Sequence, residues 1–154
     1  RNEIINFDFR YDDKEVIVAF NELFNKLLKY IPRYMTVLFE NLWWPGLTLL
    51  DKKLTGVFLD NIEHEKKGIM LDTGHLLNTN LDFKNQDEAV SYILNTVKNL
   101  GEYKKYIKGI HLHCSLSGDY VREVQKEKLL FKNEFEIISH ILKIDRHLPF
   151  ETKE

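Results

Sequence analysis

The sequence predicts an α/β fold in which short parallel strands alternate with helices, and three observations support this. Apolar runs near residues 35–42, 68–72 and 107–113 have the length of buried strands, and helical patterns separate them. The three runs lead into the polar residues Glu40, Asp72 and His111, respectively. Asp72 lies 32 positions after Glu40, and His111 lies 39 positions after Asp72. Since a strand–helix unit of a (β/α)8 barrel takes roughly 31 residues, this spacing is typical of consecutive barrel units.

A closed TIM barrel has eight strands, so three strands predict a partial (β/α)8 barrel. The 154 residues, of which 44% are apolar, are sufficient for one core. We therefore expect residues 1–154 to form a single domain that is a segment of such a barrel.

Apolar residues recur at helical spacing in segments 13–31, 51–62, 85–100 and 135–142. Typical N-cap residues precede the first three of these, and proline or glycine ends the first and the third. The N-cap candidates are Asp12 or Asp13 and Asn85, and the second segment is predicted to start near Thr48 or Asp51. By contrast, Thr73–Gly74 predicts a tight turn, residues 115–118 predict a loop, and residues 119–132 are charged and only partly periodic.

The charge balance and the single cysteine exclude several classes of protein. The 22 basic and 24 acidic side chains give a formal net charge of −2, so no global positive field attracts nucleic acid or an anionic membrane. No apolar run approaches the roughly 20 residues that span a bilayer. The single cysteine, Cys114, excludes an internal disulfide and fits a reducing compartment. We therefore expect a cytoplasmic protein with no membrane partner.

The polar residues after the first two runs are of the types that bind metal ions. Glu40 offers a carboxylate on a rigid strand end, although a solvated acid is the alternative interpretation. Asp72 and His75 lie three positions apart across the predicted turn, so both side chains can point to one ion. A carboxylate together with an imidazole suits zinc, manganese or iron.

Two further pairs follow the third run and the last helical segment. His111 and His113 alternate along a strand, so both can face one side of it, although histidines are also common in protein cores. Asp145 and His147 repeat the carboxylate–imidazole combination. Arg146, between them, can pair with an anionic substrate group or with Asp145 itself.

Two other features have both a functional and a structural interpretation. Trp43 and Trp44 follow the first strand at the end where barrel enzymes build their sites, so they can wall a sugar or base pocket or pack in the core. Cys114 has no evident activating partner in the sequence, which favours a packing role.

Together these motifs resemble those of the xylose isomerase-like TIM-barrel superfamily, which includes sugar-phosphate isomerases and epimerases and endonuclease IV. The matching motifs are Phe39-Glu40-Asn41, Leu71-Asp72-Thr73-Gly74-His75, Ile110-His111-Leu112-His113 and Ile144-Asp145-Arg146-His147. The resemblance covers roughly residues 13–150 and implies a divalent metal cofactor, which is zinc, manganese or magnesium. The metal ligands that it implies are Glu40, Asp72, His75, His111, Asp145 and His147, and the catalytic groups are Glu40 and His75.

The resemblance leaves two enzymatic functions open, with a non-catalytic alternative. In the first, the metal chelates the oxygens of a sugar or sugar phosphate during isomerisation or epimerisation, while Glu40 exchanges a proton. In the second, clustered zinc ions hydrolyse an abasic site in nucleic acid, as in endonuclease IV. The charge balance favours the small-molecule partner, whereas the motif Asp145-Arg146-His147 favours the nuclease. The third possibility is a barrel segment that serves as a binding module, and a homo-oligomer is possible in each case.

Overall fold

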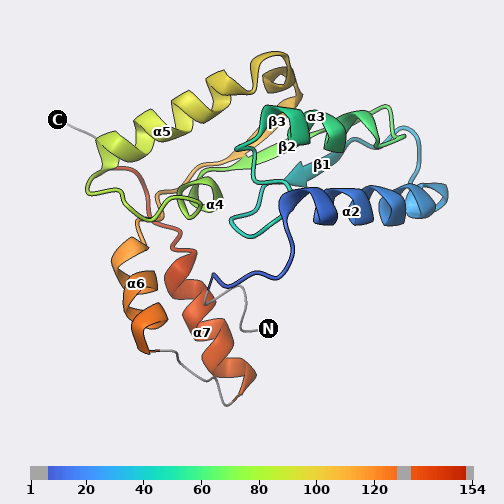
Figure 1. The fold of residues 1–154 in the computed structure, drawn as a ribbon. Coiled ribbons are helices and arrows are strands. Elements are labelled where there is room, and N and C mark those ends of the chain that lie inside the picture. The colour runs from blue at the N-terminus through green and yellow to red at the C-terminus, as the bar shows by residue number, and fades with distance from the viewer. Residues whose placement is uncertain (1–6, 128–132, 152–154) are drawn as a thin grey trace.

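The computed structural model describes residues 7–127 and 133–151 as a mixed α/β structure. Its three strands are β1 (Val37–Glu40), β2 (Lys67–Asp72) and β3 (Ile107–His111). Within the described residues they form one all-parallel sheet in the order β1-β2-β3, with helices in the connections (Figure 1). The predicted alternation of parallel strands and helices is therefore confirmed.

The register of the sheet brings the carboxyl ends of the strands to one edge. Glu40 pairs with Met70 across β1 and β2, and Asp72 pairs with His111 across β2 and β3. Glu40, Asp72 and His111 are each the last residue of their strand. Three polar side chains that lie far apart in the sequence thus become neighbours.

Two strands are shorter than we predicted. β1 does not fill 35–42, because beyond Glu40 the backbone leaves the ladder and the amide of Leu42 donates to the carbonyl of Leu47. β3 ends at His111 and not at position 113, because the amide of His113 donates to the Thr73 side chain 2.9 Å away.

Three predicted helices are confirmed, namely α2 (Asp13–Leu27), α3 (Lys52–Asp60) and α5 (Gln86–Asn99). Each begins where an acceptor side chain satisfies otherwise unpaired backbone amides of the first turn. Their N-cap residues are Asp12, Asp51 and Asn85. Short 3-10 helices, η1 (Leu28–Tyr30) and η2 (Gly101–Tyr106), follow α2 and α5.

One turn prediction is wrong, one helix was not predicted, and the final predicted helix is confirmed. Thr73–Gly74 does not form an isolated tight turn but opens the short helix α4 (Thr73–Leu77). The charged segment after residue 117 contains helix α6 (Gly118–Glu127). The buried residues of this helix are Val121 and Val124. The rest of that segment, residues 128–132, lies outside the described residues. The final predicted helix is confirmed as α7 (Glu134–Ile144).

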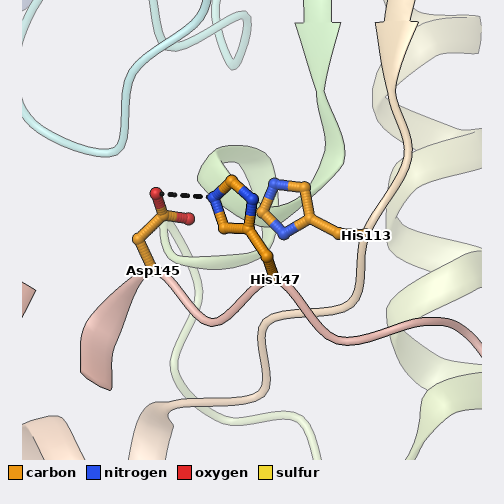
Figure 2. Close-up of side chains that lie close together, drawn as sticks. All are labelled: His113, Asp145 and His147. Carbon is orange, nitrogen blue, oxygen red and sulfur yellow. Dashed lines mark hydrogen bonds and ion pairs between the residues drawn. The ribbon is translucent and has the colours of Figure 1, made fainter. Parts of the chain in front are cut away.

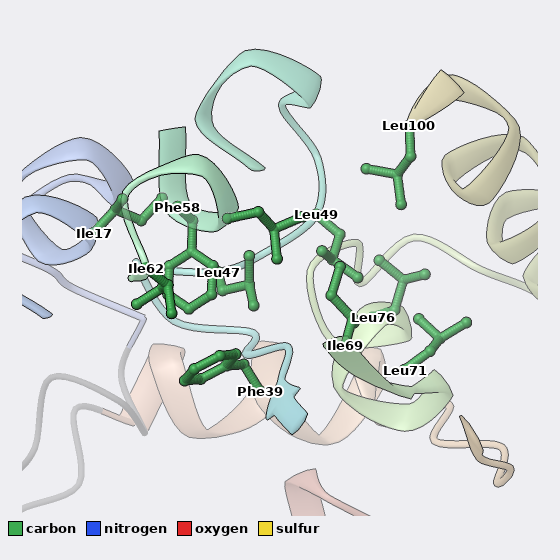
Figure 3. Close-up of a cluster of buried hydrophobic side chains, with 11 residues drawn as sticks. Ile17, Phe39, Leu47, Leu49, Phe58, Ile62, Ile69, Leu71, Leu76 and Leu100 are labelled. Carbon is green, nitrogen blue, oxygen red and sulfur yellow. The ribbon is translucent and has the colours of Figure 1, made fainter. Parts of the chain in front are cut away.

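The main core lies between the sheet and helices α2, α3 and α5 (Figures 1 and 3). Alternate strand residues, Phe39 on β1 and Ile69 and Leu71 on β2, point into it. Burial of such side chains contributes about 1.5–3 kcal/mol each, and this burial fixes which face of each strand turns inward. Its buried members are Ile17, Phe39, Leu47, Leu49, Phe58, Leu59, Ile62, Ile69, Leu71, Leu76 and Leu100.

Helices α6 and α7 lie side by side, apart from the sheet (Figure 1). A second core cluster joins them to the loop after β1, because Trp43 packs with Val121, Val124 and Ile144. The packing interpretation of Trp43 is therefore confirmed. Of the helices in the described ranges, none has both the length and the apolar character needed to cross a bilayer.

Candidate metal centre

The ends of the three strands bring Glu40, Asp72 and His111 into one group. In the described part of the chain, their potential ligand atoms all lie within 4.8 Å of one another. The Nδ1 atom of His111 is 3.5 Å from Asp72 Oδ2 and 3.7 Å from Glu40 Oε1. The Asp72 side chain is only 2% exposed, whereas those of Glu40 and His111 are 38% and 51% exposed. The group thus has a buried carboxylate at its base and two accessible ligands at its mouth.

Asp72 is held in place from two sides. Its Oδ1 accepts a hydrogen bond of 2.8 Å from the amide of His75, which makes Asp72 the N-cap of α4. The buried side chain of Asn41 accepts from the Asp72 amide at 2.8 Å and donates to the Asp72 carbonyl at 3.0 Å. The N-cap signal was present in the sequence, but the glycine two residues later favoured a turn over a helix.

The imidazole of His75 connects the strand ends to the region after α7. Its Nδ1 lies 2.8 Å from the carbonyl oxygen of Asn41 and 3.3 Å from Glu40 Oε1. Its Nε2 lies 3.4 Å from Asp145 Oδ2. The Trp43 ring packs edge-on against the imidazole, with 4.8 Å between ring centroids. Both nitrogens of His75 are therefore engaged by groups of the chain.

His113, Asp145 and His147 form a second group of potential ligands within 4.8 Å of one another (Figure 2). The Nε2 atom of His147 is 3.2 Å from Asp145 Oδ2. The rings of His113 and His147 are stacked, with centroids 4.1 Å apart and planes 24° apart. The motif that follows α7 thus completes a group with a residue that follows β3.

His113 links the two groups, although the sequence analysis did not select it as a ligand. Its Nε2 lies 2.9 and 3.1 Å from the two oxygens of Asp72, and its Nδ1 lies 3.2 Å from the carbonyl oxygen of Arg146. A side chain at position 74 would place a Cβ 2.0 Å from this ring, so only glycine fits there. The glycine of the Asp-Thr-Gly-His motif, read with the alternation of the two histidines, was the signal that could have identified His113.

The charges of the cluster shift the pKa values of two of its residues, His75 and Asp145. Burial acts to lower the pKa of His75, but the interaction with Asp145 and the charge of Asp72 outweigh it, so this pKa is raised above its usual value. Burial acts to raise the pKa of Asp145, but its contacts with His75 and His147 outweigh it and this pKa is lowered. Asp145 is therefore a carboxylate at neutral pH.

The donor set fits a divalent cation. Oxygen and imidazole nitrogen ligands together suit zinc and manganese, and three protein ligands leave coordination positions open for a substrate. Of the side chains that the structure describes, Asp145 has a buried oxygen, Oδ1, without a hydrogen-bond partner. A buried anionic oxygen without a partner is costly, and a bound cation would satisfy it.

Asp145 is positioned by a network that the sequence analysis missed. The carbonyl oxygen of Ile144 accepts hydrogen bonds from Ser115 Oγ at 2.6 Å and from Asn78 Nδ2 at 3.1 Å. The amide of Arg146 donates to the same Ser115 Oγ at 3.1 Å. Because the residues on both sides of Asp145 are anchored, its carboxylate is held against the other ligands. The segment 115–118, which we predicted to be a loop, has this supporting role.

An open groove of about 550 Å³ borders the centre. One part is formed by imidazoles and the other by exposed apolar side chains. Its lining residues are His111, Leu112, His113, His147, Leu148 and Pro149. An adjoining hollow of about 330 Å³ shares Leu148 and Pro149 and is also lined by Arg146.

None of the family models, curated proteins and solved structures that were compared with the chain matches it. The resemblance to the xylose isomerase-like superfamily thus stays a prediction, and the functional argument depends on the geometry of the centre.

The structure brings all six predicted ligands into one connected cluster. Contacts of 3.7 Å or less join them, directly or through one another. These residues are Glu40, Asp72, His75, His111, Asp145 and His147. The carboxylate of Asp145 contacts His75 and His147, and not Arg146 as the alternative interpretation predicted. Cys114 is buried, as its predicted packing role requires, and burial raises the pKa of its thiol.

Proposed function

We propose that this chain binds a divalent metal ion and isomerises or epimerises a sugar or sugar phosphate, as part of a (β/α)8 barrel of the xylose isomerase-like type. The metal in this proposal is zinc, manganese or magnesium. The observation that supports it best is that Glu40, Asp72 and His111 end three consecutive parallel strands with their ligand atoms within 4.8 Å of one another. In α/β barrels the active site lies at this end of the strands.

A divalent ion held by these side chains would polarise the carbonyl and hydroxyl oxygens of a sugar and lower the barrier to removing a proton from the adjacent carbon. Glu40 is the group that we propose to exchange this proton, because its carboxylate is partly exposed at the mouth of the centre. Both nitrogens of His75 are already engaged by the chain, so we assign to His75 the positioning of Glu40 in place of the predicted catalytic role.

The groove suits a sugar because a sugar has a hydroxyl edge and an apolar C–H face. The imidazoles of His111 and His147 would face the hydroxyl edge, and Leu112 and Leu148 would contact the apolar face. Arg146 and Glu151 both line the adjoining hollow, and we propose that the guanidinium of Arg146 pairs there with a phosphate at the end of the substrate. This arrangement favours a phosphorylated sugar over a neutral one.

The metal is tested by titrating the purified chain with Zn²⁺, Mn²⁺ and Mg²⁺ in a calorimeter. Asp72→Ala and His111→Ala should each lower the stoichiometry or the affinity, while the circular dichroism spectrum is unchanged. Glu102→Gln and His140→Ala are the matched controls, because they remove a carboxylate and an imidazole outside the centre. Unchanged binding in both site variants would contradict the proposal.

A second candidate function is metal-dependent hydrolysis of a phosphodiester in nucleic acid at an abasic site. It is favoured by the second group, His113, Asp145 and His147, which adjoins the first through the 2.9 Å contact between His113 and Asp72. Two adjacent ions can stabilise the attacking and the leaving oxygen of such a reaction. The net charge of −2 favours the small-molecule partner, which is why this function comes second.

Metal content and a paired assay separate these functions. Two or three zinc ions per chain, with incision of an abasic duplex, would favour the nuclease. Turnover in a panel of ketoses and ketose phosphates would favour the isomerase, and turnover of the phosphates should decrease in Arg146→Ala. A chain that binds no metal would favour the non-catalytic binding module. The predicted cytoplasmic location is independent of this choice and stays a prediction.

A further inference from the structure

The segments at the starts of the three strands are basic. Residues 28–36 precede β1, residues 63–68 include the start of β2, and residues 101–108 include the start of β3. Together they hold seven lysine or arginine residues against three acidic ones, whereas the whole chain has a net charge of −2. An excess of positive charge is therefore concentrated in these three segments.

The parallel sheet brings these segments together, because its register starts the three strands side by side (Figure 1). The Nζ atom of Lys66 is 3.5 Å from the carbonyl oxygen of Tyr34, which joins the first segment to the second. Lys108 reaches across to β2, since a Cβ placed on Gly68 would lie 2.6 Å from its Cγ. We call the exposed cations of this surface the basic edge, which consists of Lys29, Arg33, Lys66, Lys104, Lys105 and Lys108.

The chain does not neutralise the charges of the basic edge. Among the residues that the structure describes, no ion pair joins any of its six cations to a carboxylate, and Glu102 pairs outside the edge. Lys29 and Lys105 lie over the rings of Tyr30 and Tyr106, with 4.9 and 5.4 Å from Nζ to the ring centroid. Such a contact orients an ammonium group but leaves its charge available to an anion.

Two exposed tyrosines lie beside these cations. Tyr30 and Tyr34 are 72% and 77% exposed, and Arg33 lies between them in the chain. A ring that is so exposed contributes little to the core, but it can stack on a base. Cations next to exposed aromatic rings are the combination by which proteins bind single-stranded nucleic acid. A duplex hides the faces of its bases, so the tyrosines favour a single strand.

We propose that the basic edge binds the phosphate backbone of a single-stranded nucleic acid, with Tyr34 stacked on a base. Neighbouring strands lie about 4.8 Å apart, so their starts set the cations in a row. A row of charges fits a linear polyanion better than the plane of an anionic membrane, which is why we choose a nucleic acid. The edge is roughly 15–20 Å from Asp72 along β2, so this inference is independent of the metal centre and of its proposed functions.

The test is fluorescence anisotropy of a labelled oligothymidine strand, titrated with the whole chain in EDTA so that no divalent ion contributes. The wild type should bind with a Kd between roughly 1 and 100 µM at physiological salt. Three or four phosphate contacts should give a slope of about −2 to −3 when log affinity is plotted against log salt concentration. A slope near zero would contradict contact with phosphates.

Charge reversal locates the binding surface. Lys104→Glu combined with Lys105→Glu should weaken binding by about tenfold or more. Lys14→Glu combined with Lys84→Glu is the matched control, because it changes the net charge equally at exposed lysines outside the basic edge. This control should bind nearly as well as the wild type, and circular dichroism checks that both variants are folded. Equal losses in the two variants would overturn the proposal, because binding would then depend on net charge alone.

Two further measurements test the stacking and the kind of partner. Tyr34→Ala should weaken binding of the oligonucleotide about tenfold, whereas Tyr34→Phe, which keeps the ring, should not. Vesicles that contain phosphatidylserine should bind the chain less tightly than the oligonucleotide at the same salt concentration. The proposal is overturned if the oligonucleotide does not bind in the stated range, if Tyr34→Ala binds like the wild type, or if the chain binds the vesicles more tightly.

Discussion

The two ligand groups differ in how the chain holds them. Glu40, Asp72 and His111 are the last residues of three paired strands, so backbone hydrogen bonds of the sheet fix their positions. Asp145 and His147 follow a helix that lies apart from the sheet. Side chains such as Ser115 and Asn78, with one isolated backbone bridge between Cys114 and Leu148, hold this segment. The strand-end group is therefore set by the pairing of the sheet, whereas the second group depends on a few hydrogen bonds between segments that lie far apart in the sequence.

The largest effect is expected at the strand-end group, from Asp72→Asn. Asparagine can still cap α4, so the fold should be retained, but the charged ligand is lost. Divalent metal affinity should decrease by about 100-fold or more in calorimetric titration. Asp72→Ala should show the same loss of metal and an additional loss of about 1 kcal/mol of stability, because the cap is removed as well. Equal stability of the two variants would contradict the capping role.

A smaller effect is expected where the two groups meet, from Gly74→Ala. The added methyl group overlaps the His113 ring, so the free energy of unfolding should decrease by about 1–3 kcal/mol in urea denaturation. In a His113→Ala background the same substitution should cost clearly less, because the overlapping ring is gone. Additive costs in the double variant would show that the close approach of these residues is not the cause.

The smallest effect is expected from loosening the second group with Ser115→Ala. Loss of its hydrogen bonds to Ile144 and Arg146 should decrease stability by about 1 kcal/mol and weaken metal binding by the second group by about tenfold. Binding by the strand-end group should not change. Ser91→Ala, on the exposed side of α5, is the control and should alter neither quantity. A decrease of affinity at both groups would contradict their separate support.

The strand-end group could be predicted because its position follows from local pattern and parallel topology. Short apolar runs that end in Glu40 and Asp72, separated by helical stripes, leave few alternatives to a parallel sheet. N-caps such as Asp12 and Asn85 marked helix starts within a residue or two, because an acceptor is needed there.

The rest could not be predicted because it depends on tertiary contacts. The sequence neighbours of His113 do not show that its ring turns toward Asp72, because this follows from where β3 ends and from the close approach to Gly74, which is the residue that could have indicated it. Helix α6 was missed because its few apolar residues become a core face only against Trp43 and α7. The sequence predicts only a loop position for Ser115, because its supporting role depends on the fold placing Ile144 beside it.

We propose that the ends of three neighbouring strands, at Glu40, Asp72 and His111, form one metal site. This proposal is tested most directly by anomalous X-ray diffraction from crystals of the chain soaked in Zn²⁺. We expect a peak about 2.0–2.2 Å from side-chain atoms of Glu40, Asp72 and His111. A peak away from all three side chains, or no peak at a zinc concentration that saturates the protein in solution, would contradict it.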